Sequence, residues 1–193
     1  GCPAGLEIAE KDIQTMLDLR KPGQSIITTQ RKEDDKVEIL SGVYKGHTTG
    51  APITMLIWNK DQHSKDYDNI TLKPRPGHSD YPAYIKYKGF NDVRGGGRFS
   101  GRLTATFVMA GAIARKLLLK TLGVETFSYT CQVGNVKMKE HATTKMKNSV
   151  YSNEVRCPDP KIAEKMRQTI LAARRSGDSV GGVIESLTVN LPV

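Results

Sequence analysis

Three stretches of the chain carry apolar residues at the three- and four-residue spacing of a helix. The first stretch, residues 9–19, has charged residues between its apolar positions and is followed by Pro22 and Gly23, which end a helix. The last stretch, residues 159–175, has Pro160 in its first turn, where proline is well tolerated. The spacing predicts helices over residues 9–19, 103–118 and 159–175.

Apolar and polar residues alternate elsewhere, with the two-residue period of a half-buried strand. Gly42, Gly46 and Gly50 mark turns between the first two of these stretches. Residues 59–67 and 137–151 are polar without a clear period, and we expect them to be surface segments. The alternation predicts strands over residues 37–39, 51–57, 124–136 and 186–191. Such an order of elements is compatible with several α+β or α/β arrangements.

The composition is adequate for a packed core. The chain has 193 residues, of which 38% are hydrophobic, which suits one good-sized domain or part of a larger one. Charged residues interrupt each apolar run well short of the roughly 20 residues that a bilayer needs, and no signal peptide is recognisable. Three widely spaced cysteines form neither a disulfide framework nor a zinc pattern, so we predict no metal site and a reducing, cytoplasmic location.

The formal net charge of +9 indicates an anionic partner. Nucleic acid, an acidic surface and an anionic small substrate would each explain it. Basic residues are spread singly along most of the chain, aromatic residues make up only 6%, and no recognition-helix or base-stacking motif is present. An anionic substrate explains the charge most economically, and we predict neither a nucleic-acid nor a membrane partner.

Residues 92–102 read D-V-R-G-G-G-R-F-S-G-R and lead into the second predicted helix. Glycines let a backbone lie against a ligand, and successive N–H groups can then point into one anion-binding concavity. Arg94, Arg98 and Arg102 recur at every fourth position, and guanidinium groups bind phosphate or carboxylate with two parallel hydrogen bonds. The spacing matches neither a Walker A loop nor a dinucleotide-binding G-x-G-x-x-G motif. A polyanion-binding loop is the favoured interpretation, and a flexible basic turn is the alternative.

A second candidate segment reads P-R-P-G-H-S-D-Y and contains Arg75, His78 and Asp80. Two prolines restrict this segment, and its histidine lies between glycine and serine, with no apolar face to join. Imidazole can deliver a proton near neutral pH. His78 is therefore a candidate general acid.

The stretch G-G-R-F-S-G-R-L-T-A-T-F-V-M-A-G-A-I resembles the central signature of the chorismate synthase family. Four further motifs agree with that family, and together the five span essentially all 193 residues. They read R-K-P-G-Q-S-I-I-T-T-Q-R, S-G-V-Y-K-G-H-T-T-G-A-P-I, P-R-P-G-H-S-D-Y and R-R-S-G-D-S-V-G-G-V-I-E, and the glycines of the last motif allow a strand to approach another backbone closely. The resemblance implies an incomplete α+β fold of the family's β-α-β sandwich type, as a single partial domain over residues 1–193.

The resemblance also implies roles for particular residues. His78 is expected to protonate the leaving phosphate, and the step formed by Arg98, Phe99 and Ser100 to contact flavin. Arg20 is expected to bind substrate and, in bifunctional members, a pyridine nucleotide. The full set expected on the anionic substrate is Arg20, Arg31, Arg75 and Arg102.

The implied reaction is elimination of phosphate from 5-enolpyruvylshikimate 3-phosphate to give chorismate in the shikimate pathway. It is a lyase reaction that uses reduced FMN without net redox change, with NADPH needed where the enzyme reduces its own flavin. The full-length family member is expected to be a homotetramer. This chain starts within a family turn and stops midway, so we expect a fragment without the family's first histidine and later half. A catalytically incomplete flavin-binding or anion-binding fragment is the alternative.

Some positions depart from the family pattern. Ile26 and His63 stand where many members have arginine, and Leu103 stands where many have glutamate, which puts one carboxylate contact in doubt. His47 and His141 are interpreted as surface histidines.

Overall fold

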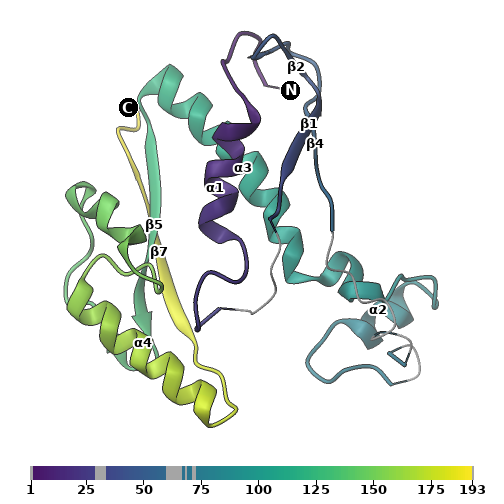
Figure 1. The fold of residues 1–193 in the computed structure, drawn as a ribbon, viewed down its shortest axis with the longest axis vertical. Helices are drawn as coiled ribbons and strands as arrows, with labels where there is room; N and C mark the ends of the chain where they lie inside the picture. The colour runs from purple at the N-terminus through teal and green to yellow at the C-terminus, as the bar shows by residue number, and fades with distance from the viewer. Residues whose placement is uncertain (1, 29–33, 60–66, 68, 71–72, 193) are drawn as a thin grey trace. The chain divides into compact units, whose positions relative to one another are not determined.

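The computed structural model of the chain describes residues 2–28, 34–59, 67, 69–70 and 73–192 (Figure 1). The chain divides into two compact units, one of Gly1–Arg20 and Lys32–Gly111 and the other of Lys21–Arg31 and Ala112–Val193. Helix α3 (Thr104–Leu122) begins in the first unit and continues into the second. Among the described residues, no helix combines the length and the apolar character needed to cross a membrane.

Helix α1 (Glu10–Arg20) anchors the first unit and confirms the helix predicted over residues 9–19. The carboxylate of Asp12 accepts a hydrogen bond from the backbone N–H of Ala9 at 2.9 Å, which satisfies one donor at the helix start. Ile13 and Leu17 are fully buried, and the helix packs against the neighbouring strand β1 (Val37–Ser41). Because this face of α1 is buried, the position of Arg20 in the last turn of the helix is also fixed.

The strands of the first unit form two small antiparallel pairs. β1 pairs with β4 (Thr54–Ile57), with an irregularity in register after Ile39, and both confirm predicted strands. β2 (Val43–Tyr44) pairs with β3 (His47–Thr48) in a region expected to be turns. The hydroxyl of Thr48 is buried and donates to the carbonyl of Pro3 at 2.6 Å, which ties the N-terminal segment to this hairpin.

Gly42 occupies the tightest point next to β4. Its φ is +80°, and a Cβ there would lie 2.7 Å from both the Pro52 carbonyl oxygen and the Ile53 side chain. We expect Gly42→Ala to lower the free energy of unfolding by at least about 2 kcal/mol, since left-handed strain alone costs about 1–2 kcal/mol. Gly46→Ala is the control, because Gly46 has a φ of +76° and a Cβ there would meet nothing within 4 Å. Urea unfolding that gives equal losses for both variants would show that the close approach of Gly42 to Pro52 and Ile53 is unimportant.

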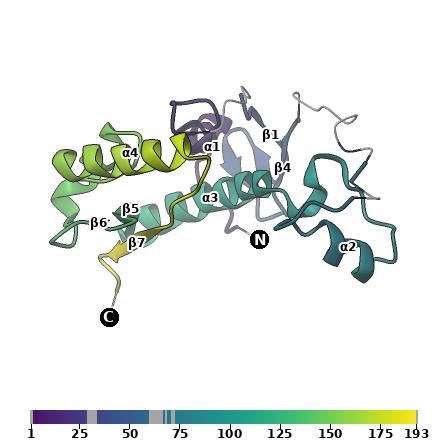
Figure 2. The same ribbon diagram turned by 90° about the horizontal axis from the view of Figure 1, so that it is seen from below.

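The second unit is built on a three-stranded antiparallel sheet in the order β6-β5-β7. β5 (Glu125–Val133) is its centre, flanked by β6 (Val136–Lys137) and β7 (Gly182–Val189). Helix α4 (Pro160–Arg175) covers one face of this sheet (Figure 2). Asp159 begins the helix by accepting hydrogen bonds from the backbone N–H groups of Lys161 and Ile162, which confirms the predicted helix of residues 159–175.

The core of the second unit lies between α4, the sheet and a 3-10 segment, η4 (Thr144–Ser152). Tyr129, Cys157 and Met166 are among its most buried side chains. The phenol oxygen of Tyr129 accepts a hydrogen bond from the backbone N–H of Ala142 at 2.8 Å. That hydrogen bond attaches the polar segment of residues 137–151 to strand β5 of the sheet.

β7 starts earlier than the predicted strand of residues 186–191. Its first residue, Gly182, lies so close to β5 that a Cβ would be 2.7 Å from the Gln132 carbonyl oxygen. The glycine pair that precedes the apolar part of the strand therefore permits close strand pairing, as the sequence motif indicated. The fold is a mixed helix and sheet arrangement, in agreement with the predicted α+β class.

Candidate functional site

An open pocket of about 330 Å³ lies in the first unit, between β4 and the start of α3. Two 3-10 segments, η2 (Arg94–Phe99) and η3 (Gly101–Leu103), complete its wall. Its apolar lining is Met55, Leu56, Ile57, Leu103, Ala105 and Met109, and its polar lining is Asn59, Arg94, Ser100, Arg102 and Thr106. A cavity of this size is typical of small-molecule sites, and its mixed lining offers both apolar and polar contacts.

Hydroxyl groups fix the backbone where the wall turns into α3. The hydroxyl of Ser100 accepts a hydrogen bond from the backbone N–H of Arg102 at 3.2 Å and so begins η3. Thr104 and Thr106 donate their hydroxyl protons to the carbonyls of Gly101 and Leu103, each at 2.7 Å. The predicted Gly-rich loop is therefore a succession of 3-10 turns that leads into the predicted helix.

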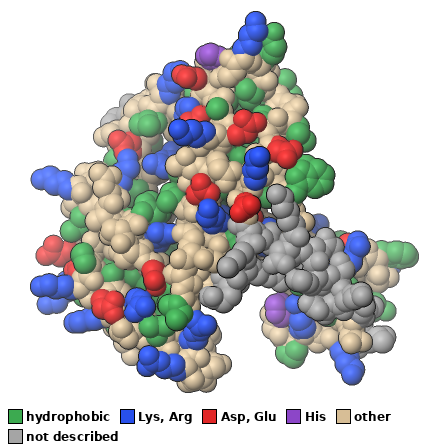
Figure 3. All heavy atoms as spheres, in the orientation of Figure 1, with side chains coloured by type: hydrophobic (Ala, Val, Ile, Leu, Met, Phe, Trp, Pro, Cys, Tyr) green, Lys and Arg blue, Asp and Glu red, His purple; other side chains and the backbone are tan. Residues whose placement is uncertain are grey.

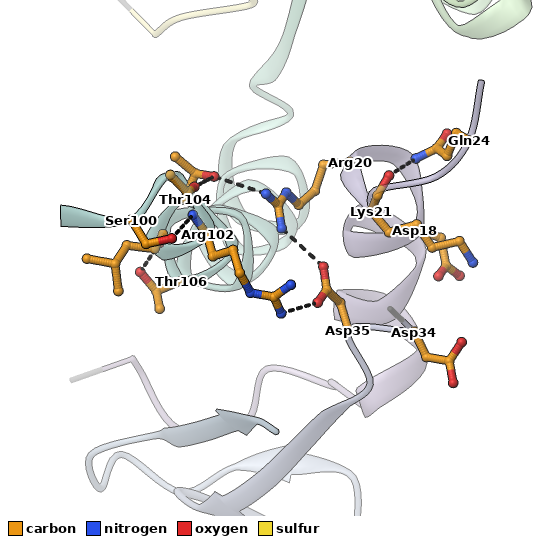
Figure 4. A network of polar contacts seen from close by, with 12 residues as sticks. Asp18, Arg20, Lys21, Gln24, Asp34, Asp35, Ser100, Arg102, Thr104 and Thr106 are labelled. Carbon is orange, nitrogen blue, oxygen red and sulfur yellow. Dashed lines mark hydrogen bonds and ion pairs between the residues drawn. The ribbon is translucent and has the colours of Figure 1, made fainter. Parts of the chain in front are cut away.

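Two arginines converge on one buried carboxylate beside this turn (Figure 4). Arg20 and Arg102 each reach a different oxygen of Asp35 at 3.1 Å, and the Asp35 side chain is 0% exposed. Arg20 also donates to the hydroxyl of Thr104 at 3.2 Å. Two of the predicted anion-binding arginines are thus brought together, and we name them with Asp35 the Arg–Asp–Arg cluster.

The segment ahead of helix α2 (Asp80–Lys86) is held by a second ion pair. The guanidinium of Arg75 donates two hydrogen bonds to the Asp80 carboxylate, at 2.8 and 2.9 Å, and its backbone N–H adds a third at 3.1 Å. These bonds keep the pKa of Asp80 below its ordinary value. His78 is exposed within this turn, and its backbone N–H donates to the Arg75 carbonyl at 3.3 Å. The predicted acid therefore sits on a turn that Arg75 closes.

This turn should open in acid. Because the folded pKa of Asp80 is lowered, its pairing stabilises the turn fully above the ordinary carboxyl pKa of about 4, and that stabilisation is lost as the pH falls through the lowered value. We expect amide exchange at the Arg75 backbone N–H, measured by NMR and corrected for intrinsic rates, to accelerate below about pH 4. Asp80→Asn should exchange fast at every pH, and an unchanged protection pattern in that variant would contradict this account.

Two of the residues predicted to contact flavin, Arg98 and Phe99, lie beside Tyr87. Arg98 donates to the Tyr87 hydroxyl at 3.3 Å, and its guanidinium lies 6.0 Å from the ring centre of Phe99. The Phe99 and Tyr87 rings are 6.4 Å apart, and Phe99 is 47% exposed. An exposed aromatic face beside a cation is a surface on which a planar, anionic ligand could stack.

Arg94 belongs to the predicted polyanion-binding loop but was given no individual role, and it lines the pocket. It pairs with Asp92, whose pKa it lowers to about 2 through hydrogen bonds from its side chain and backbone. The four-residue arginine spacing is the signal that placed it in that loop. Asp35 was missed, because a charged run such as K-E-D-D-K normally indicates a solvated surface.

The predicted residues fall into separate groups in the described structure. Ser100 and Arg102 line the pocket, and Arg20 joins Arg102 through Asp35. Arg98, Phe99, Arg75 and His78 lie in the same unit but do not appear among the lining residues of this pocket. Arg31 and His63 lie outside the described residues. Within the described part of the chain, no cluster of three or more His, Cys, Asp or Glu side chains could hold a metal ion.

Two surface histidines are accounted for. The ring of His47 contacts the Lys45 carbonyl at 3.0 Å in the β2–β3 hairpin. His141 pairs with Glu185 of β7 at 2.7 Å and lowers the pKa of that carboxyl. On the face drawn in Figure 3, Lys and Arg side chains are interspersed with Asp and Glu.

The fold and the pocket define an α+β protein in which cationic and apolar groups share one site. The sequence model of the chorismate synthase family matches residues 1–193, and the chain belongs to that family.

Similar proteins agree with this assignment. The chorismate synthase of Korarchaeum cryptofilum is 50% identical over 192 residues, which is 100% of this chain and 53% of the relative. The chorismate synthase of Parabacteroides distasonis is 50% identical over 193 residues, with the same shares. A crystal structure of a chorismate synthase superimposes with a TM-score of 0.72 at 28% identity and covers 100% of this chain and 53% of the other. The chain thus spans about half the length of the relatives it matches.

Proposed function

We propose that the natural protein carrying this chain is a chorismate synthase. It eliminates phosphate from 5-enolpyruvylshikimate 3-phosphate to give chorismate, with reduced FMN and without net redox change. The family match over every residue supports this proposal. The observation that carries it in the structure is the Arg–Asp–Arg cluster, whose Arg102 lines a pocket of mixed apolar and polar character. The substrate bears two carboxylates and a phosphate, so cationic groups must offset its charge in the site.

The chain's own residues are proposed to bind and orient the substrate. Arg20 and Arg102 bind its anionic groups, and Arg31 and Arg75 add further positive charge. The guanidinium of Arg75 is committed to Asp80 on one edge, so its contribution depends on the turn that carries His78. Charge-assisted contacts of this kind are most effective where the phosphate leaves and negative charge develops.

His78 is proposed to give a proton to the departing phosphate. Its exposed position on a turn held by the Arg75–Asp80 pair leaves the imidazole accessible to a ligand. A positioned imidazole is the side chain suited to proton donation near neutral pH. The Arg75–Asp80 pair would then orient His78 by holding its turn, since the imidazole ring is not packed in a core.

The residues around Ser100 suit a flavin in chemistry. The apolar lining can take a ring system, while Arg98, Ser100 and exposed Phe99 offer a cation, a hydroxyl and an aromatic face. When bound, reduced flavin would supply transient electron density to the substrate and accept the ring proton. Arg20 would contact a pyridine nucleotide if the enzyme reduces its own FMN with NADPH.

The wider biology follows the family. We propose that the natural protein works in the shikimate pathway for aromatic amino-acid biosynthesis, assembles as a homotetramer and is cytoplasmic. The cysteine usage supports the location, since all three cysteines are free thiols. No nucleic-acid or membrane partner is proposed.

Anaerobic phosphate release from 5-enolpyruvylshikimate 3-phosphate with reduced FMN tests the proposal. The assay is run on the natural protein and on the 193-residue chain. We expect turnover in the first and none in the second, since the chain spans 53% of its relative. Absence of turnover in both, with both folded and flavin-bound, would favour the alternative of a flavin-binding or anion-binding fragment. Affinity for DNA or RNA that falls steeply with salt would instead support a nucleic-acid function.

A further inference from the structure

The Asp35 carboxylate lies between two arginines that come from opposite ends of the first unit's sequence. One carboxylate oxygen accepts from Arg20 and the other from Arg102, both at 3.1 Å. The two arginine side chains are each 26% exposed, whereas the Asp35 side chain is 0% exposed. A ligand could therefore reach both guanidinium groups without touching the carboxylate.

We propose that Asp35 is a positioning residue that holds the guanidinium groups of Arg20 and Arg102 together as one binding surface for the anionic substrate. The inference rests on the proposed function and deepens it, because it explains how two of the substrate-binding arginines keep a common position. Two guanidinium groups this close repel each other. One carboxylate between them offsets that repulsion and leaves the cluster with a net positive charge for the ligand.

The position of Asp35 is set by the backbone around it. Its φ is +45°, in the left-handed region that Asp and Asn adopt more readily than other residues with a side chain. Gln14 of α1 accepts a hydrogen bond from the Val37 backbone N–H at 3.0 Å and donates to the Asp35 carbonyl at 3.4 Å. Helix α1 thus supplies both Arg20 and the side chain that fixes the segment carrying its partner.

Arg102 is fixed by its own neighbours in the chain. Its backbone N–H is bound by the Ser100 hydroxyl, and Thr104, two residues further on, accepts a hydrogen bond from Arg20 (Figure 4). The cluster is therefore held by contacts within the chain, which reduces the ordering that binding requires. A role limited to folding is the competing explanation, and buried ion pairs are weak evidence for stability. The two explanations make different predictions for a variant without the Asp35 charge. Only the positioning role predicts a higher KM for the substrate in a protein that still folds.

The test is Asp35→Asn in the natural protein, because asparagine keeps the shape and tolerates the same φ. Asp34→Asn is the matched control, since it removes the same charge one residue away, and the Asp34 side chain is exposed and points away from the cluster (Figure 4). We expect the KM for 5-enolpyruvylshikimate 3-phosphate to rise about tenfold or more in Asp35→Asn, with kcat changed less than about threefold. Asp34→Asn should match the wild type in both constants.

A second readout does not depend on turnover. Phenylglyoxal modifies accessible arginines, and peptide mass spectrometry gives the rate at each site. We expect Arg20 and Arg102 to react severalfold faster in Asp35→Asn than in the wild type or Asp34→Asn. Faster modification in a protein that does not turn over the substrate would sustain the positioning role and reject the proposed function. Wild-type KM together with wild-type modification rates in Asp35→Asn would overturn the positioning role.

Gln14→Ala covers the case in which Asp35→Asn does not fold. It loosens the segment that carries Asp35 while leaving every charge of the cluster in place. We expect a smaller rise in KM and a smaller acceleration of phenylglyoxal modification at the same two arginines. A folded Gln14→Ala protein that is unchanged in both readouts would contradict the inference.

Discussion

Replacement of His78 by alanine in the natural protein should lower turnover by about two to four orders of magnitude, the usual contribution of a general acid. Flavin affinity should change little, because His78 lies outside the Arg98, Phe99 and Ser100 step. The side chain is exposed and its turn is held by the Arg75–Asp80 pair, so the variant should fold normally. Single-turnover phosphate release under anaerobic conditions measures the effect.

His47→Ala is the matched control for this prediction. His47 is also exposed in the first unit, where its ring contacts a hairpin carbonyl 3.0 Å away. Its removal should leave turnover within about twofold. Equal activity of wild type and His78→Ala would remove His78 from the mechanism, and equal loss in both histidine variants would indicate a general effect on the unit.

Replacement of Arg102 by alanine should raise the dissociation constant for the substrate by about 10- to 100-fold. This range corresponds to about 1.5–3 kcal/mol for a hydrogen bond to a charged group. Stability should fall much less than for an isolated buried charge, because Asp35 keeps Arg20 as a partner. Calorimetric titration of the natural protein with substrate, and thermal unfolding of the same samples, separate the two effects.

Arg167→Ala provides the charge-matched comparison for Arg102→Ala. Arg167 pairs with Glu154 at 3.3 Å in the second unit, and both side chains are about one-third exposed. This variant should bind substrate as the wild type does. A large drop in the melting temperature of Arg102→Ala with unchanged affinity would make Arg102 a structural residue.

Long periodic elements could be predicted from the sequence. Helices α1 and α4 combine a regular apolar face with clear end signals, and Asp159 and Pro160 mark the start of α4 by chemistry that needs no tertiary contact. Helix α2 could not be predicted, because it is a short D-Y-P-A-Y-I-K segment with only Ala83 buried. Without an apolar face its spacing gives no helical period.

The β2–β3 hairpin was missed for a different reason. Lys45 and Gly46 at its tip both have positive φ, of 46° and 76°, which suits a tight hairpin turn. Asn-Gly or Asp-Gly normally indicates such a turn, whereas a lysine gives no sign of a left-handed backbone. A tertiary contact supports the hairpin instead, since the backbone N–H of Leu6 donates a hydrogen bond to the Thr48 hydroxyl.

The sequence indicated which arginines belong to the candidate site, but not which carboxylate they pair with. The arginine spacing and the family motifs indicated Arg20 and Arg102, but one sequence holds no sign that Asp35 would join them across 67 positions to Arg102. Pairing of that kind depends on how α1, β1 and the start of α3 pack. None of the roles assigned from the sequence has been tested, and all remain predictions. They are those of His78, Arg20, Arg31, Arg75, Arg98, Phe99, Ser100 and Arg102.

The pairing of β5 with β7 has a consequence for the order of folding. Val133 pairs with Gly182, so the central strand must wait for a segment about fifty residues further along the chain. At roughly 5–20 residues per second, a ribosome needs several seconds to supply it. During that interval β5 has only the two-residue β6 as a strand partner within its sheet among the described elements. This nascent strand edge is where chaperone binding or misassembly should concentrate during synthesis.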